Sequence, residues 1–259
     1  MARAFWKGVI SFGLVAIPVR MFVAAETHPL NFHLLHKKCL TRPKQVLRCE
    51  TDDEYFSIKD TVRGYEIAKD RYVVLDDADF EKVPVKTSHS VDIVGFVQAK
   101  EIDPLYFSAS HYLVPEDLGV KPFRLLCEAL EKTGRVGIAK VSFQRREHLC
   151  CMRPLDNILI LQTMHYENEI LSRKELAPPK SEVTKPELDM AVNLINAMAQ
   201  TFEPKDYKDE YQEALRKVIA AKVAGKKITA PAAPKAEIGD LMASLRASIA
   251  ATKKEPAVK

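Results

Sequence analysis

Short runs rich in β-branched and aromatic residues recur along the first 170 residues, each bounded by Pro, Gly, Asp or Asn. The predicted strands are "GVISFGLVAIPVRMFVA" (8–24), "RYVVL" (71–75), "SVDIVGFV" (90–97), "HYLVP" (111–115), "VGIAKVSF" (136–143) and "NILILQTM" (157–164). Several of these runs carry apolar residues on both faces of the strand. The pattern therefore predicts strands curled into a closed barrel, with other elements covering part of the outside.

Helical periodicity interrupts and then replaces the strand pattern. "KPFRLLCEALEKTG" (121–134) has Pro122 near its start, Gly134 just past its end and an apolar face between them. After the connector "LAPPKSEV", Thr184 and Glu187 have the spacing of a capping box, which predicts a helix start. Its apolar stripe contains Leu188, Ala191, Val192, Ile195, Met198 and Phe202. A second helix is predicted from about Tyr207 to Ala224, closed by Gly225.

The last part of the chain is predicted to be a flexible linker followed by a short amphipathic helix. From Lys226 the sequence is rich in Ala, Pro and Lys, which is typical of linkers. The segment "EIGDLMASLRASIAA" then places apolar residues at helical spacing, namely Ile238, Leu241, Met242, Leu245 and Ile249. Because a short helix beyond a linker has little core to join, its stripe is a candidate docking surface for a partner.

Composition excludes several classes of protein. The chain has 259 residues and a formal net charge of +4, so the distribution of charge matters more than the total. Its longest apolar run, "VISFGLVAIPV", is about half the length of a spanning helix, and Pro18 interrupts it. Five cysteines at irregular spacing do not form a disulfide framework. These features predict a reduced, cytoplasmic protein without a membrane partner.

The segment "HLLHKKCLTRPKQVLRC" (33–49) contains four residues of the types that bind zinc: His33, His36, Cys39 and Cys49. Neither cysteine belongs to a CxxC pair. If the segment is a strand, His33 and Cys39 share one face and His36 takes the other, and no glycine is present to make a tight turn. The spacing therefore predicts no metal site here.

The same segment concentrates positive charge, with no acidic residue between Thr27 and Cys49. Its five basic residues are Lys37, Lys38, Arg42, Lys44 and Arg48. A run of one sign repels itself unless it is solvated or meets a partner of the opposite sign. The acidic stretch "ETDDE" (50–54) could partly neutralise the run across a hairpin. These residues alone leave two interpretations open: a nucleic-acid contact or a solvated hairpin face.

No catalytic or cofactor motif emerges from the sequence. Gly8 and Gly13 have the spacing of a phosphate-binding loop, but Leu14 stands where that loop needs Lys. The adjacent pair Cys150–Cys151 is interpreted as core packing rather than redox chemistry. Phe5 and Trp6 are interpreted as barrel packing rather than as groups that stack on bases.

Several motifs, in fixed order, resemble those of prokaryotic Ku, the DNA-end-binding family of non-homologous end joining. The first is "AFWKGVISFGLVAIPVRMF" (4–22), which is similar to the family's opening strand. The others are "FHLLHKKC", "RGYE" (63–66), "YVVLDDADFE", "EIDPLYF" (101–107), "YLVPE", "GRVGIAKVSFQRREHLCCMRP" (134–154), "KDEYQEALRKVI" (208–219) and "DLMASLRASI". The resemblance covers essentially the whole chain.

The resemblance implies a mainly β fold: a Ku-type barrel core over residues 1–180, with a long strand bridge at about residues 28–63. A helical arm over 181–225 would embrace the second subunit of a homodimer, and residues 226–259 would form the flexible linker and ligase-recruiting helix. The two bridges would close a ring through which the end of a DNA duplex threads. The resemblance implies no catalytic activity, no cofactor and no metal, and a cytoplasmic, nucleoid-associated location.

The resemblance also assigns roles to residues. Lys37, Lys38, Arg42, Lys44 and Arg48 lie on the bridge and would meet DNA phosphates, with Arg20, Lys59 and Arg63, and also Arg145 and Arg146, as further positive groups. The apolar stripe of residues 238–249 would bind an ATP-dependent DNA ligase of the ligase D type. Relatives with more cysteines near Cys39 and Cys49, or with a long Lys-rich tail, differ from this chain.

A second hypothesis is an interaction scaffold that acts mainly through its C-terminal helix on a partner enzyme, with DNA contact secondary. A third, an intrinsic nuclease or ligase activity, finds no support in a phosphate loop, carboxylate cluster or nucleophilic lysine motif.

Overall fold

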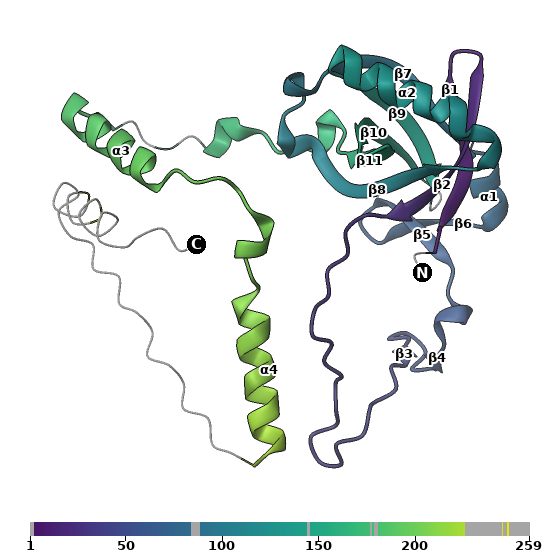
Figure 1. The fold of residues 1–259 in the computed structure, drawn as a ribbon. Helices are drawn as coiled ribbons and strands as arrows, with labels where there is room; N and C mark the ends of the chain where they lie inside the picture. The colour runs from purple at the N-terminus through teal and green to yellow at the C-terminus, as the bar shows by residue number, and fades with distance from the viewer. Residues whose placement is uncertain are drawn as a thin grey trace. The chain divides into compact units, whose positions relative to one another are not determined.

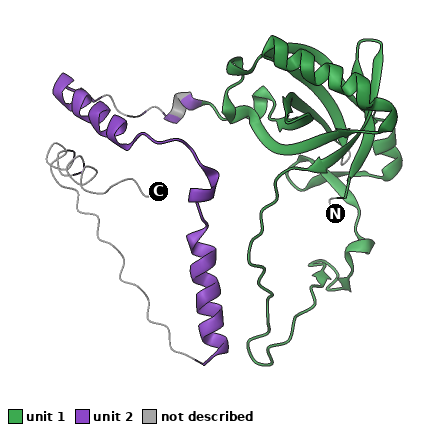
Figure 2. Cartoon of the chain, in the orientation of Figure 1, with its two compact units in different colours: residues 1–172 green, residues 173–259 purple. Residues whose placement is uncertain are grey.

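The protein is described by a computed structural model for residues 3–83, 89–143, 146–176, 178 and 181–225, together with 245 and 248. The chain divides into two compact units, residues 1–172 and 173–259 (Figure 2). The predicted domain boundaries at 180 and 225 stay predictions. None of the described helices is long and apolar enough to cross a membrane.

The first unit contains a closed barrel in the strand order β1-β2-β8-β11-β10-β9-β7 (Figure 1). Its strands are β1 (Trp6–Phe12), β2 (Val15–Val23), β7 (Ser90–Gln98), β8 (Phe107–Pro115), β9 (Arg135–Phe143), β10 (Arg146–Leu155) and β11 (Ile158–Met164). The pair β1 and β7 is parallel, and the other neighbours are antiparallel. The predicted closed barrel is confirmed.

The barrel interior and one helix share a single hydrophobic core. Helix α2 (Val120–Thr133) buries Phe123, Leu126, Cys127 and Leu130 against the barrel. Gly134 ends the helix in the left-handed conformation, with φ of +63°, which glycine adopts without strain. Cys150 and Cys151 are buried, so their interpretation as packing residues is confirmed.

One strand prediction was wrong in detail, and one strand was missed. The run 8–24 is not one strand but the hairpin of β1 and β2, since Gly13 adopts φ of +59° and Phe12 pairs with Val15. Strand β10, which pairs with β9 and β11, was missed. Its sequence "REHLCCMRPL" contains no β-branched residue, so strand propensity does not mark it.

Between β2 and β7 the chain forms smaller elements. They are β3 (Leu47–Arg48) with β4 (Tyr55–Phe56), β5 (Arg63–Ala68) with β6 (Arg71–Leu75), and helix α1 (Asp77–Glu81). Short 3-10 helices lie at Ile58–Asp60, Ala99–Glu101, Pro104–Tyr106, Asp117–Gly119, Glu167–Glu169, Arg173–Leu176 and Pro204–Asp206.

The second unit contains α3 (Lys185–Met198) and α4 (Glu210–Val223). The predicted capping box is present, because the amide of Thr184 donates to the Glu187 carboxylate at 2.7 Å. The helix ends at Met198, so Phe202, which was predicted to belong to its apolar stripe, lies beyond the helix. Leu188, Val192, Ile195 and Met198 on α3 are all exposed.

Candidate nucleic-acid interface

Residues 28–63, here called the bridge segment, leave the barrel after β2 as an extended loop (Figure 1). Most of this segment is not strand, which corrects the prediction of a strand bridge: only β3 and β4 pair within it before β5 begins at Arg63. Nearly all of its side chains are exposed, with Leu30, Cys49 and Phe56 half-buried. Within the described residues, the hydrogen bonds and ion pairs made by 28–62 join residues of this segment to one another.

Four of the five predicted basic side chains are exposed and have no ion-pair partner among the described residues. They are Lys37, Lys38, Arg42 and Lys44. The fifth, Arg48, forms an ion pair with Asp53 across the β3–β4 hairpin. The acidic stretch 50–54 therefore neutralises one end of the run and leaves the other four charges free to meet an anionic partner.

The additional basic residues differ in their surroundings. Lys59 is exposed and unpaired within the described part of the chain. Arg63 contacts the Asp77 carboxylate at 3.2 Å, and its guanidinium lies 5.1 Å from the centroid of the Phe80 ring. Arg20 lies in β2, half-buried, with its Nε buried and without a hydrogen-bond partner among the described residues. Arg63 is thus a less available phosphate ligand than Lys59.

Two further arginines were predicted near the end of the barrel. Arg146 begins β10 and forms an ion pair with Glu169. Arg145 lies outside the described residues.

One step of the metal argument is corrected by the turn at residues 36–41. The chain makes a tight turn without glycine, because Leu40 adopts φ of +54°, and its amide donates to the His36 carbonyl at 2.7 Å. His36 Nδ1 consequently lies 3.0 Å from Cys39 Sγ, so these two residues do converge. Among the described residues, however, no group of three or more His, Cys, Asp or Glu side chains is arranged to hold a metal ion.

The turn also alters the chemistry of Cys39. Hydrogen bonds from the hydroxyl and the amide of Thr41, and then from His36, lower the pKa of the Cys39 thiol to about 7. Cys39 is exposed. The thiol of Cys49 instead hydrogen-bonds to Asp52, which lowers the pKa of that carboxyl. The two cysteines therefore have separate partners, each within the bridge segment.

Most of the predicted partner-binding residues lie outside the part of the chain that the structure describes. Ile238, Leu241, Met242 and Ile249 lie outside the described residues. Leu245 is described as a half-buried helical residue. The role of this stripe stays a prediction.

Comparison with known proteins gives consistent results over the whole chain. The family model for the Ku70/Ku80 beta-barrel domain matches residues 11–190. A relative from Solibacter usitatus is 40% identical over 263 residues, covering 100% of this chain and 98% of the relative. Relatives from Archaeoglobus fulgidus and Bacillus subtilis are 38% and 36% identical, covering 97% of this chain in each case and 100% and 83% of the relative. All three carry the name "Non-homologous end joining protein Ku".

Proposed function

The chain belongs to the Ku family of non-homologous end joining proteins, and from this premise we propose that it binds the ends of double-stranded DNA during break repair. The observation that carries the proposal is the bridge segment, whose exposed and unpaired cations are Lys37, Lys38, Arg42 and Lys44. Their contacts to phosphates carry no base information, so binding is independent of sequence. Lys59 adds to this surface, and Arg20, Arg48 and Arg63 contribute less.

Two copies of the chain act together in this proposal. Each bridge segment supplies half of a closed ring, and the duplex end threads through this ring. Because a closed ring can load only where a duplex ends, the protein would select ends without reading sequence. The exposed apolar face of α3 supports a second copy as its partner, because solvated Leu188, Val192, Ile195 and Met198 side chains gain free energy on burial. The ring has no catalytic activity of its own.

Joining the ends requires an enzyme, and we assign its recruitment to residues 226–259. The stripe of Ile238, Leu241, Met242, Leu245 and Ile249 would dock an ATP-dependent DNA ligase of the ligase D type. Removal of residues 226–259 separates this proposal from the scaffold hypothesis. A DNA-end-binding ring keeps its affinity for ends and loses only ligase stimulation, whereas a scaffold acting through this helix loses its measurable activity altogether.

The threading mechanism is tested by comparing a linear duplex with a covalently closed circle of the same sequence in a gel-shift assay. The proposal expects binding to the linear duplex and little to the circle; equal affinity would exclude threading. Two copies of four unpaired cations present eight charges, so log K should fall with log salt at a slope of about −7. A flat salt dependence would exclude the bridge segment as the phosphate-binding surface.

A further inference from the structure

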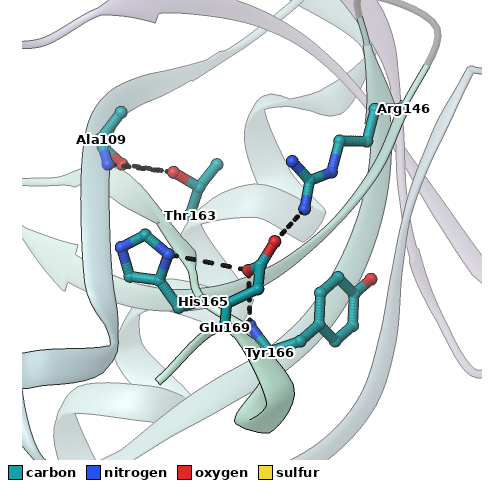
Figure 3. Close-up of polar contacts among 6 residues, drawn as sticks. All are labelled: Ala109, Arg146, Thr163, His165, Tyr166 and Glu169. Carbon is teal, nitrogen blue, oxygen red and sulfur yellow. Dashed lines mark hydrogen bonds and ion pairs between the residues drawn. The ribbon is translucent and has the colours of Figure 1, made fainter. Parts of the chain in front are cut away.

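A cavity of about 570 Å³ lies at one end of the barrel, within the first unit. Its lining comes from the ends of several barrel strands and includes Phe5, Val23, His111, Phe143, Arg146 and His148. A volume of this size is in the range of sites that bind small organic groups. Figure 3 shows polar residues at this end of the barrel, with Arg146 and His165 both directed toward Glu169.

The apolar wall of the cavity is a cluster of aromatic rings. Phe143 stacks on His148 with ring centroids 4.3 Å apart and an interplanar angle of 17°. Phe5 meets Phe143 edge to face at 5.8 Å, and 42% of Phe5 is exposed. The backbone holds Phe5 independently of its ring, since its amide donates to the Met21 carbonyl at 3.1 Å. The exposed Phe5 ring is therefore available to stack on a planar ligand.

The cavity wall also contains two imidazoles with unsatisfied nitrogen atoms. His111 is only 7% exposed. Its Nδ1 atom and the Nε2 atom of His148 are both buried and have no hydrogen-bond partner among the described residues. The backbone of Leu161 raises the pKa of His111, and the backbone of Phe143 raises that of His148, but in both rings burial has the larger effect. A neutral imidazole has one N–H and one acceptor nitrogen, so each ring can present an acceptor to a ligand. Burial lowers the pKa of both rings, which favours this neutral form.

Thr163 and Glu169 at the cavity already have hydrogen-bond partners. The Thr163 hydroxyl accepts from the Ala109 amide at 3.0 Å and donates to its carbonyl at 3.2 Å (Figure 3). The carboxylate of Glu169 accepts from Arg146 and from the Tyr166 amide, and lies 3.6 Å from His165 Nδ1. Because Glu169 occupies one terminal nitrogen of Arg146, the guanidinium keeps other N–H groups for an anion such as a phosphate.

Strand order places the cavity at the end of the barrel where the bridge segment is attached. Val23 lines the cavity and is the last residue of β2, so the chain departs toward the bridge segment there. The chain re-enters the barrel at β7, where Val91 pairs with Val141 of β9, two residues before Phe143. A ligand held between the bridge segment and the barrel would therefore face the end of the barrel that contains the cavity.

We propose that the cavity receives an unpaired base at a DNA end, a role that rests on the proposed function. The base stacks on Phe5, and Arg146 contacts the adjacent phosphate. A donor on its Watson–Crick edge reaches the bare imidazole nitrogens after a small side-chain shift. Every base has such a donor, and only an unpaired base has it free. An aliphatic or phenyl side chain from a protein partner would leave both nitrogens unsatisfied, which carries a free-energy cost.

The experiment uses the full chain and duplexes that carry the fluorescent base 2-aminopurine, because stacking quenches its emission. One duplex has a single unpaired 2-aminopurine at its end, and the other has the base paired in the interior. We expect quenching only with the unpaired base, and at least about fivefold tighter binding than to the matched blunt duplex. The variant Phe5→Ala should remove both effects while leaving binding to blunt ends intact.

The matched control is Phe12→Ala. Phe12 is 39% exposed and lies at the opposite end of β1, in edge-to-face contact with Phe96. It should behave as the wild-type protein does. A second variant, His148→Phe, keeps the stacked ring and removes the acceptor, so it should reduce the preference for the unpaired base.

The outcomes distinguish this inference from the proposed function. If blunt ends bind but the unpaired base is neither quenched nor preferred, or if Phe5→Ala changes neither signal, the base site is excluded and a protein-docking role for the cavity becomes the better hypothesis. If neither duplex binds in preference to closed circles, the end-binding function itself fails.

Discussion

Arg48 and Asp53 form an ion pair across the β3–β4 hairpin, and this contact divides the basic run of the bridge segment into two kinds of charge. Arg48 already has an anionic partner in the free protein. Lys37, Lys38, Arg42 and Lys44 have none among the described residues. A phosphate that binds Arg48 must therefore compete with Asp53, whereas the four other cations exchange only water and counterions.

Asp53→Asn should strengthen DNA binding by removing that competitor. Asp53 adopts φ of +59°, a conformation that asparagine tolerates, so the turn should be kept. We expect the salt dependence of log K to steepen by about one unit in magnitude per chain that gains a phosphate contact. Binding constants measured at several salt concentrations, from about 50 to about 200 mM, give this slope. The matched control is Glu50→Gln, which removes one negative charge without releasing Arg48; equal effects of both changes would mean that only net charge matters.

Removing unpaired cations should have the opposite effect. The double variant Lys37→Gln with Lys38→Gln removes four charges from a two-copy ring, so the salt slope should become shallower by about 3 to 4. The control pair, Lys100→Gln with Lys132→Gln, removes the same charge from outside the bridge segment. If the two pairs weaken binding equally in the gel-shift assay, the bridge segment has no special role in DNA contact.

The periodic elements were predictable because their signals are local. Strand runs, the α2 stop at Gly134 and the Thr184–Glu187 capping box each depend on a few neighbouring residues. The β1–β2 hairpin was predicted as a single strand because apolar residues continue through Leu14, which is fully exposed at the tip. An exposed leucine at a turn has the same sequence signature as a buried one.

The site was predictable only in part, for a related reason. The basic residues of the bridge segment lie close together in the chain, so their positive charge is visible in the sequence itself. The pairing of Arg63 with Asp77, and the turn that brings His36 to Cys39 without glycine, depend on backbone geometry. The cavity was not foreseen at all, because Phe5 precedes β1, His111 lies in β8 and His148 lies in β10, and they meet only when the barrel closes. Phe5 was interpreted as barrel packing, yet it is substantially exposed.

Cys39 should react with alkylating reagents near neutral pH. Its Sγ lies 2.9 Å from the Thr41 hydroxyl, and its pKa of about 7 means that thiolate accumulates above that pH. We expect half-maximal alkylation rate near pH 7, and Thr41→Val should move that midpoint up toward the ordinary value of 9.0. Iodoacetamide labelling in a Cys49→Ser background isolates the signal, since Cys127, Cys150 and Cys151 are buried. An unchanged midpoint in Thr41→Val would contradict the assigned hydrogen bond.

Gly119→Ala should destabilise the first unit. A Cβ atom at Gly119 would lie 2.7 Å from the Pro18 carbonyl oxygen, which is already fixed by a hydrogen bond from the Glu116 amide. We expect a loss of about 1–3 kcal/mol in the free energy of unfolding, measured by urea denaturation. Gly95→Ala is the control, because a Cβ there meets nothing within 4 Å, and it should leave stability unchanged or slightly raised. Similar losses in both variants would rule out the steric explanation.

Mild acid should destabilise the cavity end of the barrel before carboxylates titrate. Burial lowers the pKa of His111 and His148 below the ordinary value of 6.5, and for His148 the Arg146 guanidinium lowers it further. Below pH 6.5 the unfolded chain therefore binds protons that the native chain does not, so stability falls as the pH drops from 6.5 toward the folded pKa values and levels off below them. Glu169, whose pKa is lowered from 4.5, contributes only in stronger acid.

Thermal unfolding between pH 7.5 and 5.5 measures this loss, and His148→Phe should reduce it. The phenyl ring can keep the stacking on Phe143 but cannot bind a proton. Of the two histidines, only His111 then titrates in this variant. The variant should consequently lose fewer degrees in Tm than the wild-type protein across this interval. An identical loss would mean that His148 is equally protonated in the native and unfolded states, and that its buried nitrogen is accessible to solvent.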